Sequence, residues 1–424
     1  MVTNWIAIIA VGLVSIVWVE LIRDFYHALS HHWKPLYQLH VWHHRVFRPD
    51  LSPVSTAIYR QAHWYNDVPE SLAMLGFSFL PWLAAYFYFP QYQGLAWAGS
   101  GYTLSFLISA IARGTGFAYA DELTDLTHRP GTFEASPSHW FVNRSYHWRH
   151  HFDDQKAYYS GTLTFVDKLM GTALSLKGKK IAITGASGTL GKALIKELRK
   201  KEAKVTALTS KENTVTLYEN GQHCPIKTLN WQVGKEAELS ATLEDIDILI
   251  LNHGINVGGE RTAEAITKSY EINAFSSWRL LELFLTTVHS NEDIATKEVW
   301  VNTSEAEVSP AFSPLYELSK RTLGDLVTLR RLDTPCTVRK LILGPFKSNL
   351  NPIGIMSSEK VAQQIINLAQ RDFLNIIVTI NPLTWLTFPC KELAVSTYFN
   401  LFSNKGNEFL EDVQKIANGD EGLA

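Results

Sequence analysis

The 424-residue chain carries a formal net charge of −2, and a balance this close to neutral argues against a nucleic-acid partner. Its three cysteines, Cys224, Cys336 and Cys390, lie far apart and form no CxxC pair, which excludes a disulfide framework and a cysteine zinc site. We therefore expect the C-terminal half of the chain to face a reducing compartment.

Three apolar runs near the N-terminus, 4–22, 71–89 and 94–112, are each long enough to cross a bilayer. The first run has no positive leader and no clear cleavage site, so we interpret it as a retained anchor and not as a signal peptide. Segment 23–60 carries five lysines and arginines against two aspartates, and the positive-inside rule places it in the cytoplasm. The short PQYQ link makes the other two runs a hairpin, so the chain from Arg113 onward is expected to be cytoplasmic too.

Histidine is concentrated in three motifs on this expected cytoplasmic side. Imidazoles spaced i, i+3 and i+4 share one face of a helix, and neutral imidazole is a ligand for zinc, iron and copper. A solvated basic helix face is the alternative, but six of the 15 histidines fall between residues 27 and 44, which favours a metal site. The motifs are HALSH, HVWHH and HWRHH, with His27 and His31, with His40, His43 and His44, and with His147, His150 and His151.

These motifs together resemble the fatty acid hydroxylase superfamily, which includes sterol desaturases and plant cuticular-wax proteins. The resemblance covers roughly 17–172 and extends to GTLTFVDKLMGT, where Asp167, Gly171 and Thr172 match a segment of the family. It implies a helical membrane domain with two iron ions, bound by the eight histidines above and by His128 in THRPG. His139 is a weaker candidate, and no second clear HxxxH precedes HWRHH. Carboxylates that could orient the histidines are Asp24, Asp121, Glu122 and Asp125.

After the junction LKGKK the pattern changes to alternating strands and helices, which is typical of a doubly wound parallel α/β sheet. Strands are expected at 180–184, 204–208, 247–251, 299–303, 337–343 and 375–380. In IAITGASGTLGKAL the glycines Gly185, Gly188 and Gly191 follow a strand and open a helix, as in a dinucleotide-binding turn. Ser187 lies within the same turn.

LYELSK places Tyr316 and Lys320 one helical turn apart, where a lysine can lower the pKa of a tyrosine that acts as acid and base. Ser304 or Thr303, about a dozen residues earlier, could polarise a substrate carbonyl. Together with the glycine turn these residues resemble the short-chain dehydrogenase/reductase family over about 178–380. The resemblance adds Asn252 and Gly254 in NHG as cofactor-binding residues and Asn273 as the fourth member of a Ser–Tyr–Lys–Asn tetrad.

The end of the second expected strand reads TSKEN, with Lys211 after two hydroxyl residues and no leading carboxylate. A carboxylate there would bind the ribose hydroxyls of NAD, whereas a lysine suits a 2′-phosphate, so NADP is favoured over NAD.

The expected organisation is a di-metal membrane domain (1–175), a dehydrogenase domain (176–380), an apolar membrane-associated segment (381–402) and a polar tail (403–424). Packing of 381–402 on the sheet is an equal alternative. We expect O2-dependent hydroxylation or desaturation of a membrane lipid, plus NAD(P)-dependent alcohol or carbonyl oxidoreduction in relay with it. The electrons would come from an external ferredoxin or cytochrome. An alkane-forming aldehyde-processing enzyme and a non-catalytic nucleotide- and metal-binding protein are the alternatives.

Overall fold

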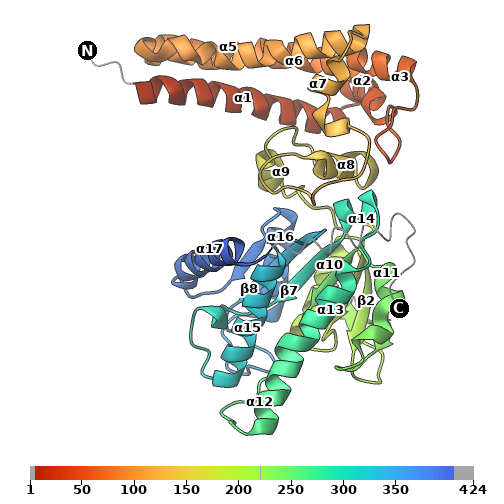
Figure 1. Ribbon diagram of the computed structural model, residues 1–424, viewed down its shortest axis with the longest axis vertical. Helices are drawn as coiled ribbons and strands as arrows, with labels where there is room; N and C mark the ends of the chain where they lie inside the picture. The colour runs from red at the N-terminus through yellow and green to blue at the C-terminus, as the bar shows by residue number, and fades with distance from the viewer. Residues whose placement is uncertain (1–4, 220, 405–424) are drawn as a thin grey trace. The chain divides into compact units, whose positions relative to one another are not determined.

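The computed structural model describes residues 5–219 and 221–404 and divides into two units, Met1–Leu174 and Ser175–Ala424, shown in Figure 1. The division falls one residue from the expected domain boundary. Beyond Asn404 the expected polar tail lies outside the described residues.

The first unit is helical. Three stretches, Trp5–His32, Thr56–Tyr88 and Pro90–Thr115, are long and apolar enough to cross a membrane. They contain most of the three expected apolar runs, and each extends beyond its run. The unit consists of α1 (Trp5–His32), α2 (Lys34–His44), α3 (Thr56–Ala62), a π-helix (His63–Asp67), α4 (Val68–Phe77), α5 (Phe79–Tyr88), 3-10 turns (Pro90–Trp97 and Leu126–His128), α6 (Ala98–Thr115), α7 (Ala120–Thr124), α8 (Arg144–Phe152) and α9 (Phe165–Met170).

Helix α1 continues past the expected end of the apolar run because its first charged residues have buried partners. The Arg23 guanidinium pairs with Glu20 one turn earlier and donates to Thr162 Oγ1 at 2.7 Å. The Asp24 carboxylate accepts a hydrogen bond from the Gly161 amide at 2.9 Å. The uninterrupted helix therefore carries His27 and His31 on its last two turns.

The second unit is built on a parallel seven-stranded sheet in the order β5-β2-β1-β6-β7-β8-β9. Strand β1 pairs on one side with β2, from Lys180 opposite Lys204 onward, and on the other side with β6. This order confirms the expected doubly wound fold. The strands are β1 (Lys180–Thr184), β2 (Lys204–Thr209), β5 (Lys227–Asn230), β6 (Ile248–Leu251), β7 (Glu298–Asn302), β8 (Thr337–Leu343) and β9 (Asn375–Val378).

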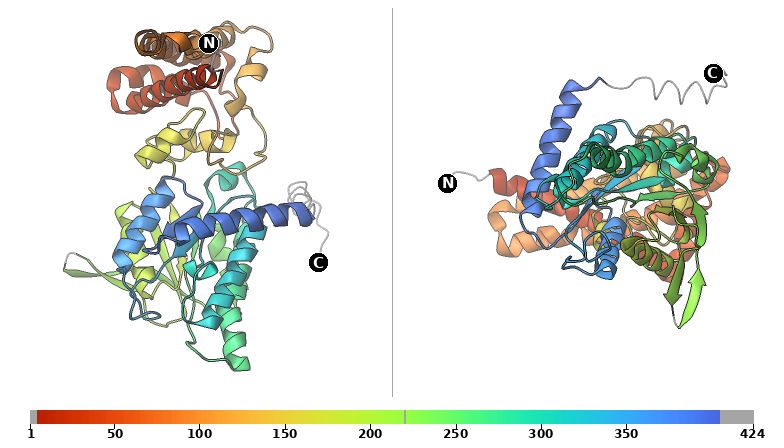
Figure 2. Two further views of the ribbon diagram at one scale, coloured as in Figure 1. Left: turned by 90° about the vertical axis from the view of Figure 1, so that its left-hand side faces the viewer. Right: turned by 90° about the horizontal axis from the view of Figure 1, so that it is seen from below.

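Three short strands were not expected from the sequence. Strand β5 lies at the sheet edge, and β3 (Thr216–Glu219) and β4 (Gln222–Pro225) form a separate antiparallel pair, drawn in green in Figure 2. Each has four residues and carries polar side chains, so none shows the apolar pattern of the central strands.

Helices cover both faces of the sheet (Figure 1). A large buried cluster combines Val299 and Val301 of β7 with Leu280, Leu281 and Phe284 of one helix. The helical segments of this unit are α10 (Thr189–Lys200), a 3-10 turn (Glu236–Leu239), α11 (Ser240–Glu244), α12 (Ala263–Tyr270), a π-helix (Glu271–Phe275), α13 (Ser276–Leu285), α14 (Asn291–Thr296), a 3-10 turn (Glu305–Glu307), α15 (Pro314–Arg330), α16 (Ser358–Gln370) and α17 (Thr384–Phe402).

Helix α17 occupies most of the expected apolar segment 381–402. Its inner face packs on the domain, because Thr384 and Phe388 are fully buried and Phe388 contacts Ile342 and Ile377 of the sheet. In Figure 2 the C-terminal part of α17, in dark blue, projects away from the other helices and strands of this unit.

A buried ion-pair network links β7, β8 and the segment just before β9. Arg339 donates to both oxygens of Glu298 at 2.8 Å and to Asp372 at 2.8 Å, and the Trp300 indole donates to Glu298. The side chains of Glu298 and Arg339 are fully buried. Loss of one charge from such a pair leaves the other without its counter-charge in a medium of low polarity.

We expect Glu298→Gln to lower the free energy of unfolding by about 3 kcal/mol, as is typical when a buried pair is broken. The exposed pair between Lys200 and Glu197 provides the control, since Lys200→Ala should cost less than about 1 kcal/mol. Urea denaturation of the full chain, followed by tryptophan fluorescence, measures both. Equal effects of the two substitutions would contradict the assignment.

Candidate metal centre and dehydrogenase site

Nine histidines of the first unit gather into two groups whose ligand atoms lie within 4.8 Å of one another. These are the nine that the sequence singled out as metal ligands, and among the described residues each group consists of histidine alone. The first cluster contains His27, His31, His40, His44 and His150, and the second contains His43, His128, His147 and His151.

Helix periodicity explains how the motifs divide between the clusters. In α2 the pair His40 and His44, one turn apart, faces the first cluster, while His43 faces the second. In α8 the arrangement is reversed, because His147 and His151 face the second cluster. The remaining α8 histidine, His150, faces the first, so each of these helices contributes to both clusters.

Hydrogen bonds at Nδ1 orient four of the rings. The Nδ1 atoms of His27 and His150 lie 2.7 and 2.8 Å from the main-chain oxygens of Tyr159 and Ala157. Because a carbonyl oxygen can only accept, both rings carry their proton on Nδ1 and present the Nε2 lone pair to the cluster. His40 is held in the same way by Asn66 Oδ1 at 2.8 Å. The fourth ring, His128, is held by Asp125 Oδ1 at 2.6 Å.

The arrangement of nitrogens fits bound cations. The Nε2 atoms of His27 and His150 lie 2.9 Å apart, and those of His31 and His150 lie 3.1 Å apart. Two lone pairs at the first distance repel each other unless a cation lies between them. Burial lowers the pKa of His40 to about 4 and that of His150 well below its ordinary value, so the rings are neutral ligands.

The second cluster has the same character. The Nε2 atoms of His147 and His128 lie 2.9 Å apart, and those of His151 and His147 lie 3.1 Å apart. Burial lowers the pKa of His43 and His147 well below the ordinary value. Among the buried side-chain atoms described without a hydrogen-bond partner are the Nδ1 atoms of His147 and His151, which leaves the ring tautomer free to match a metal.

Among the other residues that the sequence suggested for the metal centre, the structure places some beside the clusters and others away from them. Of the four carboxylates considered, Asp125 alone contacts a ligand ring among the described hydrogen bonds, whereas Asp121 pairs with Arg60 and Asp24 with the Gly161 amide. His139 is in neither cluster. Asp167 accepts hydrogen bonds from the amides of residues 159 and 160, and it thereby positions the segment whose carbonyls hold His27 and His150.

Three residues that orient the ligand histidines were not identified from the sequence. Asn66 lies in the π-helix His63–Asp67, and nothing in the letters WYND marks it as a partner of His40. Ala157 and Tyr159 act through main-chain oxygens, which no side-chain pattern reveals.

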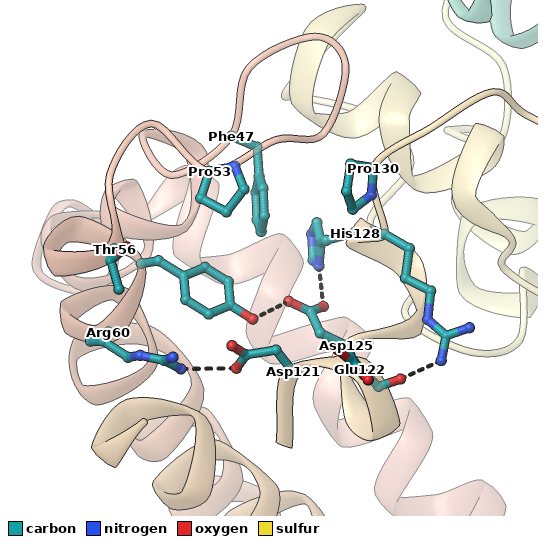
Figure 3. A pocket seen from close by; sticks show the side chains of 11 residues that line it. Phe47, Pro53, Thr56, Arg60, Asp121, Glu122, Asp125, His128 and Pro130 are labelled. Carbon is teal, nitrogen blue, oxygen red and sulfur yellow. Dashed lines mark hydrogen bonds and ion pairs between the residues drawn. The ribbon is translucent and has the colours of Figure 1, made fainter. Parts of the chain in front are cut away.

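A cavity of about 590 Å³ adjoins the second cluster at His128 (Figure 3). Phe47 stacks on the His128 ring, with centroids 4.3 Å apart, and Tyr59 donates to the Asp125 carboxylate that holds the same histidine. Arg60 and Asp121 form an ion pair on its wall. The volume is within the usual range of small-molecule sites, so a ligand in the cavity would contact residues next to the histidines.

We expect His150→Ala to remove the metal of the first cluster, because His150 Nε2 lies against three other ring nitrogens there. Metal content of the purified protein, measured by plasma mass spectrometry, should fall by at least half. His139→Ala is the matched control and should leave the content unchanged. A His150→Ala protein with full metal content would refute the assignment.

In the second unit the backbone of the glycine turn is packed too closely for side chains at two of its positions. A Cβ on Gly191 would lie 2.5 Å from the Gly185 oxygen, and one on Gly185, whose φ is +63°, would lie 2.9 Å from the His253 Cα. Only glycine fits both positions. Helix α10 begins at Thr189 directly after this turn, so free amides of its first turn face the position of a pyrophosphate. The cradle fits a dinucleotide.

The other expected nucleotide contacts lie around this turn. Asn252 and His253 donate to Thr184 Oγ1 at the end of β1. Thr209 at the end of β2 donates to Ser187 Oγ at 3.0 Å and accepts from the Lys211 amide.

The four tetrad residues come from three elements and converge. Lys320 donates to the Asn302 oxygen at 2.8 Å, and Asn273, within the π-helix Glu271–Phe275, bonds to both main-chain polar groups of Ile255. Gly254 adjoins this pair, since a Cβ there would lie 3.1 Å from Asn273 Oδ1. The π turn interrupts the helix where Asn273 must reach the loop after β6.

Ser304, and not Thr303, faces the tyrosine. Burial raises the pKa of Tyr316, and a hydrogen bond with Ser304 opposes that rise. Thr303 is buried and its hydroxyl points to the Leu341 oxygen of β8. Burial also lowers the pKa of Lys320 to about 8, so its ammonium is present below pH 8. Ser304, Tyr316 and Lys320 together can therefore exchange a proton with a substrate hydroxyl or carbonyl.

Gly191→Val should weaken NADPH binding roughly tenfold or more, because the new side chain would collide with the backbone of Gly185 and Ala186 and displace the glycine turn. Quenching of NADPH fluorescence measures the affinity, and the same titration with NADH measures the cofactor preference. Gly259→Ala is the control, since no atom lies within 4 Å of its added Cβ. Unchanged affinity in Gly191→Val would place the nucleotide elsewhere.

The match to a protein-family model agrees with the fold of the second unit. Residues 179–350 match the model of the short chain dehydrogenase family. Two solved structures that resemble the chain are the ligand-free aldohexose dehydrogenase of Thermoplasma acidophilum (16% identity, 48% of this chain and 93% of that one, TM-score 0.39) and a short chain dehydrogenase from Burkholderia cenocepacia in complex with NADP (16% identity, 55% and 100%, TM-score 0.43).

One curated relative matches almost the whole chain. The monoglucosyldiacylglycerol epimerase of Synechocystis sp. is 60% identical over 405 residues, which are 95% of this chain and 99% of the relative. The match includes both the helical unit with its histidine clusters and the dehydrogenase unit. The chain therefore belongs to the same family as this Synechocystis protein, a family of enzymes that join a histidine-rich helical domain to a short-chain dehydrogenase domain.

Proposed function

We propose that the protein epimerises the sugar headgroup of a glycosyldiacylglycerol lipid at a membrane, with the dehydrogenase site carrying out the change of configuration. The observation that carries this is the assembled Ser304–Tyr316–Lys320–Asn273 site in a chain that is 60% identical to a glycolipid epimerase along nearly its whole length. A bound nicotinamide dinucleotide, for which the sequence favours NADP, supplies a reversible acceptor of hydride.

The residues of the site provide the proton chemistry that epimerisation requires. Tyr316, as phenolate, takes the proton of a sugar hydroxyl while hydride leaves the same carbon, and the product is a ketone. Ser304 donates a hydrogen bond to the ketone oxygen. A bound dinucleotide would accept this hydride and return it to the opposite face of the carbon. Tyr316 returns the proton, so the headgroup is inverted at that carbon with no net oxidation.

Charged Lys320 favours the phenolate form of Tyr316 by its positive field. Its ammonium is lost as the pH rises through about 8, so turnover should decline above that pH. Asn273 keeps the loop after β6 against the helix of Tyr316 through its bonds to Ile255 and to Ser319 Oγ.

A second candidate adds the histidine clusters to the reaction, and the nine converging imidazoles favour it. Two iron ions held there would supply O2-dependent oxidation of a C–H bond, the chemistry of lipid hydroxylation and desaturation. Conversion of the carbinol to the ketone would then consume O2, two protons and two electrons from a ferredoxin or cytochrome and release two waters. The dehydrogenase site would reduce the ketone with NADPH and a proton.

Both candidates place the protein in a membrane with several spans, for which the three long apolar helices are the support. The histidine clusters and the dehydrogenase unit are proposed to face the cytoplasm, where nicotinamide cofactors and electron donors are available. The substrate would be a membrane lipid in either case.

Vesicles containing monoglucosyldiacylglycerol with deuterium on the sugar ring carbons test the proposal and separate the two routes. The purified protein should yield an epimeric hexose, identified by chromatography after hydrolysis. Full retention of deuterium indicates hydride transfer out and back, whereas loss of one deuterium together with O2 consumption indicates the second route. If no epimeric hexose forms, the proposal is wrong.

Tyr316→Phe should slow headgroup conversion by at least about 10²-fold, the usual contribution of a general acid–base group. Binding of NADPH should persist, because the glycine turn is unaltered. Tyr270→Phe, a conservative change on α12, is the control and should convert the lipid at the normal rate. Normal conversion by Tyr316→Phe would remove the tetrad from the mechanism.

A further inference from the structure

Helix α17 presents an apolar surface that packs on no described part of its own unit. We define its outer face as Leu386, Cys390, Leu393 and Leu401. The three leucines are 66%, 71% and 70% exposed, and Cys390 is exposed too. Trp385, Tyr398 and Phe402 flank this face and are also exposed. A helix on an aqueous surface normally shows charged side chains there.

The charges of α17 point the other way. The sequence of the helix contains two charged residues, Lys391 and Glu392, and both are directed into the domain. Lys391 Nζ lies 2.8 Å from a carboxylate oxygen of Glu307, whose side chain is fully buried. Glu392 pairs with the buried Lys340 at 2.8 Å and with Arg331 at 3.2 Å. These ion pairs fix the rotation of the helix and hold its apolar side outward.

The helix is also attached to the dehydrogenase site. Thr384, its first residue, donates to the Glu305 carboxylate at 3.2 Å, and Glu305 directly follows Ser304. Lys391 binds Glu307 in the same 3-10 turn. Whatever covers the outer face of α17 is therefore connected to the catalytic loop by two side-chain contacts.

We propose that the outer face of α17 lies in the surface layer of the lipid bilayer, with the helix parallel to the membrane plane. The chain itself brings the bilayer within reach, because the helical unit with three candidate spans ends at Leu174 and the dehydrogenase unit begins at the next residue. Trp385 and Tyr398 are the side chains that favour the boundary between headgroups and acyl chains.

The same helix is unsuited to cross the membrane. Pro389 lies inside it, and Lys391 and Glu392 are held in ion pairs with the domain. The charged side of α17 cannot leave these partners without exposing Lys340 and Glu307, which are fully buried. An interfacial position satisfies both sides of the helix at once.

The native cysteines allow a direct test on the full chain without any substrate. Cys336 is buried, so Cys224→Ser leaves Cys390 as the thiol that a nitroxide reagent can label. After reconstitution into dioleoylphosphatidylcholine vesicles, the Cys390 label should collide several-fold more often with O2 than with a water-soluble nickel chelate. A label on Cys224 of the β3–β4 pair, in Cys390→Ser, is the reference and should show the aqueous pattern.

Leu386→Glu combined with Leu393→Glu should restore nickel access at Cys390, whereas Tyr218→Glu, at a similarly exposed aromatic of the β3–β4 pair, should not. Retained NADPH binding verifies that the variants are folded. An aqueous pattern at Cys390 in the unmodified helix overturns the proposal. Strong spin–spin broadening at Cys390 without preferential O2 access also overturns it, because a second copy of the chain would then cover the face.

Discussion

The first unit depends on one electrostatic constraint, which is that nine imidazoles converge on two small volumes. Four of these rings have Nδ1 committed to oxygen acceptors, so His27 and His150 cannot bond to each other across their 2.9 Å separation. Repulsion between such nitrogens is relieved by a cation and by little else. The hydrogen bonds that the rings donate to Tyr159, Ala157, Asn66 and Asp125 therefore destabilise the clusters when no metal is bound. They favour metal binding, because they direct the Nε2 lone pairs into the clusters.

The two units differ in their redox requirements, and this difference frames the function. A Tyr–Lys dehydrogenase site with a retained cofactor can invert a carbinol without consuming any oxidant. A histidine-bound metal pair with O2 consumes electrons at every turnover. A glycolipid epimerase needs only the first, yet the relative that shares 60% identity matches 95% of this chain, histidine unit included. The presence of the histidine unit across that match is the reason to weigh a joint reaction.

The sequence predicted the parts of the structure that follow from periodicity. Helical spacing predicted that the histidines of each motif lie close together on a helix, and the glycine turn and the YxxxK step predicted the core of the dehydrogenase unit. It did not predict β5 or the β3–β4 pair, because four-residue strands with polar side chains leave no apolar pattern. It predicted an apolar run that ends at residue 22 but not that the helix continues unbroken to His32, since the partners that bury Arg23 and Asp24 come from distant segments.

Other features depend on tertiary contacts and could not be read from the letters. The choice of Ser304 over Thr303 follows from the turn after β7, which directs one hydroxyl to Tyr316 and the other to Leu341. Asn66 supports His40 only because a π turn rotates it toward α2. The division of each HxxHH motif between two clusters likewise requires α2 and α8 to be packed together.

That division has a consequence for assembly. Because α2 and α8 each contribute ligands to both clusters, neither cluster can be completed until both helices are in place. The first ion to bind orders both helices and incurs the entropic cost of that ordering. The second ion then binds to a site that is already ordered. If both clusters hold an ion, we therefore expect positively cooperative loading, in which by linkage each ion raises the affinity for its neighbour by the same factor. Such a centre passes between empty and filled states with little of the half-filled species in between.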